Sequence, residues 1–119
     1  MLYLRSCGFM LFLFLTCYVM RTIMWVKMIR SFKNKDTEFI YSGGRVEKWQ
    51  SFSRQVERRL QILDNATSLE DLRYLPSNRF EALSGNRKGQ YSIRINQQWR
   101  VCFQWIDNEA HGVEIVDYH

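Results

Sequence analysis

The amino-acid sequence predicts an α+β domain in which helices pack on one face of a mostly antiparallel β-sheet. Two observations lead to this fold class. Apolar residues in the first half of the domain recur every three or four positions, the period of an amphipathic helix, whereas from Arg79 onward they alternate with a period of two, which is typical of strands. Short polar turns separate the alternating runs, so successive strands should pair antiparallel. A strand, then helices, then a meander is the order of an α+β domain.

The first 27 residues differ in composition from the rest. They contain no acidic residue, and residues 6–20 are uncharged and rich in Leu, Phe and Met. This run is short for a membrane-spanning helix, which needs about 20 apolar residues, and no alanine precedes Ala66 to form a signal-peptide cleavage site of the usual kind. We interpret residues 1–27 as the product of a misplaced upstream start, with a membrane or signal segment as the alternative. Residues 28–119 then form one domain.

The domain begins with a predicted strand at residues 28–32, with Ile29 on one side and Phe32 on the other. A short helical turn is predicted at residues 37–41, ended by Ser42 and two glycines. The clearest element is a helix of about five turns. Its apolar face is formed by Val46, Trp49, Phe52, Val56, Leu60 and Leu63. Ser68 followed by Asp71 indicates an N-cap and one further turn before Pro76.

Four strands are expected after the helices, at residues 80–83, 91–95, 100–105 and 113–117. Turns are expected at residues 85–89, 96–98 and 107–112, which places His111 in a solvated hairpin turn. Trp99 and Trp105 are interpreted as packing residues rather than base-stacking platforms. Cys102 lies in an apolar run and should be a buried, small apolar residue.

Composition argues against several kinds of site. The domain contains one cysteine, and its Cys and His residues lack metal-ligand spacing, so we expect neither a metal nor a cofactor. Glycine-rich phosphate loops, dinucleotide motifs and nucleophile elbows are absent. Three of the 17 basic residues lie in residues 1–27, which leaves the domain 14 against 12 acidic residues. Its basic excess lies between Arg73 and Arg100, where Glu81 is the single acid.

The chain ends on three groups that can carry or orient protons, Asp117, Tyr118 and His119, directly after a predicted strand. Arg94 and Arg100 lie on strands expected nearby. Cleavage of a phosphodiester by the ribose 2′-hydroxyl needs a base, an acid and positive charge near the phosphorus. In a continuous strand Asp117 and His119 share one face and Tyr118 points to the other. The three groups can therefore converge only if the strand ends or twists near Asp117.

The segments SGNRKGQYSIRINQQWRVCF and VEIVDYH, with MIRSF, LDNAT and LPSNRFEAL, resemble the HigB-like branch of the RelE superfamily, toxins of bacterial type II toxin–antitoxin systems. The resemblance covers essentially all of residues 28–119. It implies a RelE-like compact domain, metal-independent cleavage of mRNA in the ribosomal A site, and a HigA-like helix-turn-helix antitoxin as partner. Glu81 and Ala82 stand where several relatives have His-Pro, and Ser84 replaces a frequent lysine. These departures remove a candidate histidine and a phosphate-facing cation.

The resemblance also implies roles for individual residues. His119 is the candidate proton carrier, because an imidazole changes charge near neutral pH. Asp117 would orient it or accept a proton, and Tyr118 would stack on a base or donate a proton. Arg94 and Arg100 would stabilise the transition-state charge, since a guanidinium can engage two phosphate oxygens. We expect the remaining basic residues of the domain's middle to bind RNA phosphates: Arg73, Arg79, Arg87 and Lys88.

Plainer interpretations remain beside these roles. The last residue of a chain is often frayed, Tyr118 could be a core phenol against the helices, and exposed strand arginines are commonly inert. Taken with the residues above, the family resemblance implies a cytoplasmic, ribosome-dependent endoribonuclease toxin. The alternative is a catalytically weakened RelE-fold protein that acts only as an RNA- or antitoxin-binding module. A membrane-tethered form would follow if residues 1–27 are translated and act as an anchor.

Overall fold

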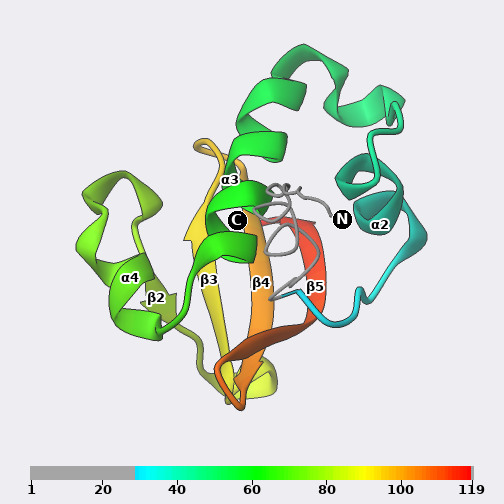
Figure 1. The fold of residues 1–119 in the computed structure, drawn as a ribbon. Coiled ribbons are helices and arrows are strands. Elements are labelled where there is room, and N and C mark those ends of the chain that lie inside the picture. The colour runs from blue at the N-terminus through cyan, green and yellow to red at the C-terminus, as the bar shows by residue number, and fades with distance from the viewer. Residues whose placement is uncertain (1–28, 119) are drawn as a thin grey trace, which may run out of the picture.

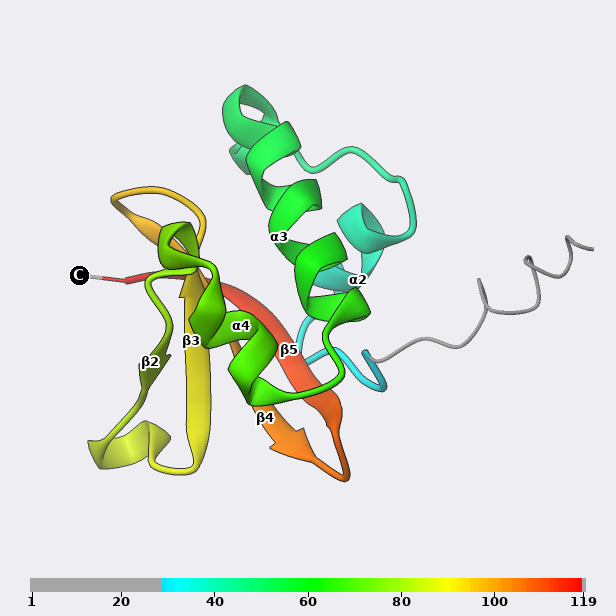
Figure 2. The ribbon, with the colours of Figure 1, turned by 60° about the vertical axis from the view of Figure 1, so that its left-hand side comes forward.

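A computed structural model of the chain describes residues 29–118, so the predicted leader at residues 1–27 and His119 lie outside the described residues. The fold is α+β. A four-stranded antiparallel sheet has the strand order β2-β3-β4-β5, and the helices lie together on one side of it (Figures 1 and 2). The predicted fold class is confirmed. Within residues 29–118, no helix has the length and apolar character needed to cross a membrane.

The strands follow one another along the chain as a meander. They are β2 (Glu81–Ala82), β3 (Gln90–Arg94), β4 (Trp99–Ile106) and β5 (Glu109–Asp117). The turn between β4 and β5 is tighter than the sequence suggested, because Asp107 and Asn108 take positive φ angles of 53° and 63°. Two consecutive residues with positive φ form a two-residue hairpin turn. The expectation that His111 lies in the turn is therefore wrong: it lies in β5 and pairs with Gln104.

The segment before the first helix follows β5 in the parallel direction. It forms two isolated bridges, Ile29 with Ala110 and Phe32 with Val113, rather than a full strand. Ile29 and Phe32 both pack against the core, so the predicted placement of these two side chains on opposite sides is wrong. Their spacing of three fits a segment that is tied to the sheet at separate points.

The predicted five-turn helix is divided into a 3-10 helix, η1 (Glu47–Phe52), and an α-helix, α3 (Ser53–Asn65). The break falls at Phe52, where φ is −133° and ψ is 31°. The apolar spacing explains the division. Val46, Trp49 and Phe52 are three residues apart, which is the repeat of a 3-10 helix, whereas Val56 and Leu60 follow at the four-residue steps of an α-helix.

The remaining helical elements are short: α2 (Lys35–Tyr41), α4 (Leu69–Tyr74), η2 (Pro76–Asn78) and η3 (Gly85–Arg87). Side chains cap the start of α2 and of α4. Asn34 Oδ1 accepts a hydrogen bond from the Thr37 N–H at the start of α2, and Ser68 Oγ accepts one from the Asp71 N–H at the start of α4. The predicted turn after Ser68 is thus confirmed.

The hydrophobic core lies between the helices and one face of the sheet. Leu60 and Leu63 of α3 and Leu72 of α4 are fully buried, as are Ile93 and Phe103 of the sheet. Trp99 and Trp105 pack against this core, which confirms their interpretation as packing residues.

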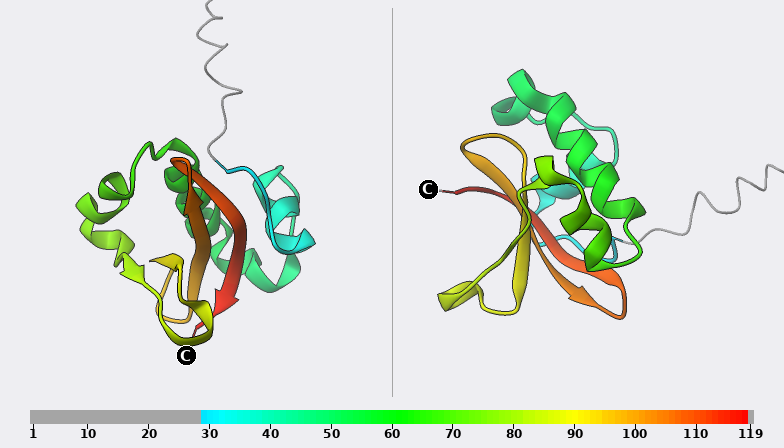
Figure 3. Two further views of the ribbon diagram at one scale, coloured as in Figure 1. Left: turned by 90° about the horizontal axis from the view of Figure 1, so that it is seen from below. Right: turned by 90° about the vertical axis from the view of Figure 1, so that its left-hand side faces the viewer.

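The opposite face of the sheet is polar, and within residues 29–118 no α-helix covers it (Figure 3, right). Because side chains alternate along a strand, it carries the residues between the core positions. We call it the open face. Its central residues are Ser92 and Arg94 of β3, Arg100 and Cys102 of β4, and Glu114 of β5.

Candidate active site on the open face

Strand register brings the two predicted catalytic arginines side by side. Arg94 of β3 pairs directly with Arg100 of β4, and Arg100 pairs with Val116 of β5. Directly opposed residues of an antiparallel pair project to the same face. Both guanidinium groups therefore belong to the open face, close to the point where β5 ends.

Arg100 is buried, with 8% of its surface exposed, and it is held by neutral oxygen atoms. Its Nε donates to Ser92 Oγ at 2.8 Å, and its Nη2 donates to the backbone carbonyls of Arg79 and Ser92. Within residues 29–118, no carboxylate forms an ion pair with it. Hydrogen bonds thus fix the group while leaving its positive charge uncompensated there. A buried charge in this state favours an anion from outside.

Arg79 contributes to this arrangement through its backbone. It ends η2 in the left-handed conformation, with φ 45° and ψ 51°, and its carbonyl accepts the hydrogen bond from Arg100. The side chain of Arg79 was predicted to bind substrate, and the residue is exposed. The structure thus places Arg79 beside Arg100.

Tyr118 lies over Arg100. The ring centroid of Tyr118 is 5.8 Å from Arg100 Cζ, and the Tyr118 backbone N–H donates to the carbonyl of Gln98 at 2.7 Å. Such a contact of a cation with an aromatic face is attractive. The alternative of a core phenol against the helices is wrong, because Tyr118 is 38% exposed on the side of Arg100.

Asp117 lies at the same end of the sheet but in a different row. It pairs with Trp99, whose ring packs towards the helices, and its Oδ2 accepts a hydrogen bond from Gln98 Nε2 at 2.9 Å. Asp117 and Tyr118 therefore leave β5 in opposite directions, as alternation predicted. Gln98, in the turn between β3 and β4, holds both residues. The structure brings Tyr118, but not the Asp117 side chain, against Arg100.

Arg94 is half-buried, and its Nε donates to the backbone carbonyl of Asn96 at 3.1 Å. Asn96 also organises the turn, since its Oδ1 accepts hydrogen bonds from the N–H groups of Gln98 and Trp99. Like Arg100, Arg94 is anchored by a neutral oxygen. The turn between β3 and β4 thus fixes both Arg94 and the end of β5.

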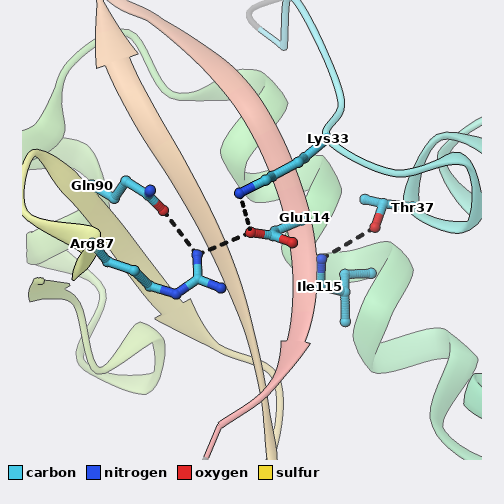
Figure 4. Close-up of polar contacts among 6 residues, drawn as sticks. All are labelled: Lys33, Thr37, Arg87, Gln90, Glu114 and Ile115. Atoms are coloured by element: carbon cyan, nitrogen blue, oxygen red, sulfur yellow. Dashed lines mark hydrogen bonds and ion pairs between the residues drawn. The ribbon is translucent and has the colours of Figure 1, made fainter.

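The other predicted phosphate ligands are more varied. Arg73 Nη1 contacts Glu70 Oε2 at 2.7 Å, and its guanidinium lies over the Phe80 ring. Arg87 Nη1 contacts Glu114 Oε2 at 2.9 Å (Figure 4), and this hydrogen bond is the main cause that raises the pKa of Arg87. Lys88 is exposed. Arg73 and Arg87 therefore already have anionic partners, unlike Arg94 and Arg100.

Sequence reasoning missed the residues that hold the site together, Ser92, Asn96 and Gln98. One signal was available for Ser92: it stands two positions before Arg94 in an alternating strand, so it had to share the face of the arginines. Glu81, which replaces a histidine of several relatives, pairs with Ser92 and thus also belongs to this face.

Two other kinds of site were sought among residues 29–118. No group of three or more His, Cys, Asp or Glu residues has a metal-binding arrangement there. A cleft lies between α2 and α3, on the helix side, and contains none of the predicted site residues. It is lined by Ile40, Tyr41, Glu57, Leu60, Gln61 and Asp64. Burial and the nearby Asp64 carboxylate raise the pKa of Tyr41 to about 12.

The fold is that of the RelE-like toxins. A chain of a YoeB–YefM complex from Staphylococcus aureus superposes with a TM-score of 0.50 at 20% sequence identity, over 76% of this chain and 97% of that chain. A family model of the RelE-like toxin HigB of type II toxin–antitoxin systems matches residues 30–119. Toxin HigB-1 of Vibrio cholerae is 44% identical over 85 residues, which are 70% of this chain and 90% of the relative. Endoribonuclease HigB of Proteus vulgaris is 33% identical over 94 residues, 77% of this chain and 100% of the relative.

The chain therefore belongs to the HigB-like family of RelE-like toxins of type II toxin–antitoxin systems. The resemblance seen in the sequence motifs is confirmed. Membership of such a system implies a cognate antitoxin as partner.

Proposed function

We propose that this chain is a cytoplasmic endoribonuclease that cleaves mRNA in the ribosomal A site by a metal-independent route. The single observation that carries the proposal is Arg100: a buried guanidinium held by neutral oxygens on the open face, with the Tyr118 ring over it. A relative, Endoribonuclease HigB, supports the reaction class.

In the proposed reaction the 2′-hydroxyl of the ribose attacks the neighbouring phosphorus and the 5′-oxygen leaves, which yields a cyclic phosphate and a free 5′-hydroxyl. Arg100 and Arg94 bind the non-bridging oxygens, whose negative charge grows in the transition state. His119 takes or returns protons, with Asp117 orienting it, and Tyr118 stacks on a base or donates a proton. Asp117 and Tyr118 leave β5 in opposite directions, so in this proposal Asp117 acts through His119, whereas Tyr118 contacts the RNA bound at Arg100.

The anchoring of Arg100 supports a transition-state role rather than general affinity. A guanidinium that is already oriented loses little conformational freedom when it binds an oxyanion, and it needs no reorganisation as charge develops. Arg73, Arg79, Arg87 and Lys88 are proposed to bind phosphates farther along the RNA or on ribosomal RNA, where affinity is independent of sequence. The proposed partner is a HigA-like helix-turn-helix antitoxin. Residues 1–27 are proposed to lie outside the toxin domain at residues 28–119.

The test is induction of the full chain in bacteria, with and without the change Arg100→Ala. The wild type should arrest growth and generate cuts within translated mRNA, visible as primer-extension stops, whereas the variant should do neither. Arg54→Ala is the matched control, because Arg54 is an exposed arginine of α3. A wild-type chain that binds RNA or antitoxin without cutting mRNA would instead favour the binding-module alternative, to which Glu81 and Ser84 point.

A further inference from the structure

A second basic cluster lies on the open face, next to the candidate active site. Lys33, Arg87, Gln90 and Glu114 come from four separate segments and converge above β4 and β5 (Figure 4). Glu114 precedes Val116 by two residues, which is about 7 Å along a strand, and Val116 stands directly opposite Arg100. The cluster is thus one step along the open face from the predicted phosphate-binding arginines.

Glu114 is the anion of this cluster. Its Oε2 contacts Arg87 Nη1 at 2.9 Å and Lys33 Nζ at 3.6 Å, and only 12% of its side chain is exposed. Arg87 Nη1 also donates to Gln90 Oε1 at 3.1 Å. Both contacts use the same nitrogen. Among residues 29–118, no acceptor contacts Nε or Nη2 of Arg87, so the guanidinium keeps N–H groups to offer.

Strand register places the two clusters next to each other on the open face. Glu114 pairs directly with the buried Cys102 of β4, and Arg100 precedes Cys102 by two residues on the same strand and face. The Arg87 guanidinium, which contacts Glu114, is therefore on the same part of the face as Arg100. An RNA strand bound at Arg100 would have a neighbouring phosphate within reach of Arg87.

We propose that Arg87 and Lys33 form a second phosphate-binding subsite in which Glu114 is a built-in counter-anion that the RNA phosphate displaces. The inference rests on the proposed function, because its ligand is the phosphate backbone of a single-stranded RNA. Its consequence is a lower affinity for RNA in general, since backbone phosphates carry no sequence information. The choice of RNA sequence then depends on the other contacts of the bound RNA.

The test measures binding of the full chain to a fluorescent 2′-O-methyl ribo-oligonucleotide, which lacks the attacking hydroxyl, in roughly 50 to 200 mM KCl. Glu114→Gln keeps the size of the side chain but removes the anion. Binding should tighten about three- to fivefold, the upper part of the range for a partly exposed ion pair. The slope of log affinity against log salt should steepen by up to about 0.7, the value for one phosphate of a single strand, because the variant has no displaced carboxylate to take up a cation when RNA binds.

Two variants separate this effect from a simple change in net charge. Glu109→Gln removes the same charge at the far end of β5, where Glu109 pairs with Arg30, and it should change affinity and slope less than Glu114→Gln does. Arg87→Gln combined with Glu114→Gln should lose the gain. The proposal is overturned if Glu114→Gln matches Glu109→Gln, weakens binding, or tightens it without a steeper slope, or if the double variant keeps the gain.

The cleavage assay distinguishes the two levels of the argument. A wild-type chain that cuts mRNA but shows no specific effect of Glu114→Gln refutes the subsite alone. A wild-type chain that neither binds the oligonucleotide nor cuts mRNA refutes both the subsite and the proposed function.

Discussion

Replacing Arg100 by Ala should abolish cleavage with a limited loss of stability. The change removes the donors to Ser92 Oγ and to the carbonyls of Arg79 and Ser92. Hydrogen bonds of a charged group contribute about 1.5–3 kcal/mol, and water can enter the space left on the open face. We therefore expect the free energy of unfolding to fall by about 2 kcal/mol, which lowers the Tm by about 10 °C for a domain of this size. Removal of one donor to a developing oxyanion lowers kcat by about 10²- to 10³-fold.

These magnitudes decide between a catalytic and a structural effect. A domain with a stability of about 5 kcal/mol or more stays almost fully folded after a loss of 2 kcal/mol, so unfolding would remove little activity. The assay is single-turnover cleavage of mRNA on programmed ribosomes, with a thermal melt of each variant. A kcat within about threefold of the wild type, less than 1 kcal/mol in activation free energy, in a folded variant would refute the role of Arg100.

Arg100→Lys tests the geometry separately from the charge. Lysine keeps the positive charge but lacks the planar fork that reaches Ser92 and Arg79 together. We expect at most partial activity. If Arg100→Lys were fully active, the proposal that an oriented guanidinium matters would be wrong, although a positive charge at this point could still be needed.

Three further predictions concern stability and titration. Asn78→Ala should lower the free energy of unfolding by about 2–3 kcal/mol in a denaturant titration, because buried Asn78 donates to the Leu72 carbonyl and accepts from Arg59. Ser68→Ala should cost about 1 kcal/mol in the same measurement, through loss of the cap on the Asp71 N–H. Tyr41 should ionise near pH 12 in an ultraviolet titration, above the reference value of 10.0 for the tyrosine side chain, and Tyr41→Phe should remove that step. Because folding raises this pKa, the stability linked to Tyr41 is complete below the unfolded pKa of about 10 and is lost as pH rises towards 12.

The fold class could be predicted from the sequence because the spacing at which apolar residues recur distinguishes a helix from a strand. The apolar positions from Val56 to Leu63 and the alternation from Tyr91 onward both became core faces. The failures lie where local spacing admits two geometries. Steps of three at Val46, Trp49 and Phe52 fit a 3-10 helix as well as an α-helix. The turn at Asp107 depends on two left-handed residues, for which Asp gives only a weak signal.

The residues of the candidate site followed from the family motifs, but their contacts did not. The motifs pointed to Arg94, Arg100 and Tyr118; strand register pairs Arg94 with Arg100, and the Tyr118 ring lies over Arg100. The partner that holds each arginine could not be predicted in the same way, because it depends on side-chain direction and on distant segments. Arg79, whose carbonyl accepts the hydrogen bond from Arg100, takes a left-handed conformation. No periodic pattern encodes that angle.

Arg87 and Arg100 have different proposed roles because their hydrogen-bond partners differ in charge. Both guanidinium groups belong to the open face near Cys102, yet Glu114 neutralises Arg87, whereas the anchors of Arg100 are uncharged. An arginine whose carboxylate partner is displaced by phosphate exchanges one anion for another, so its net gain is small. An arginine held by a hydroxyl and two carbonyls gives up no anion. In our two proposals, the same residue type therefore limits affinity for RNA at one position and stabilises transition-state charge at the other.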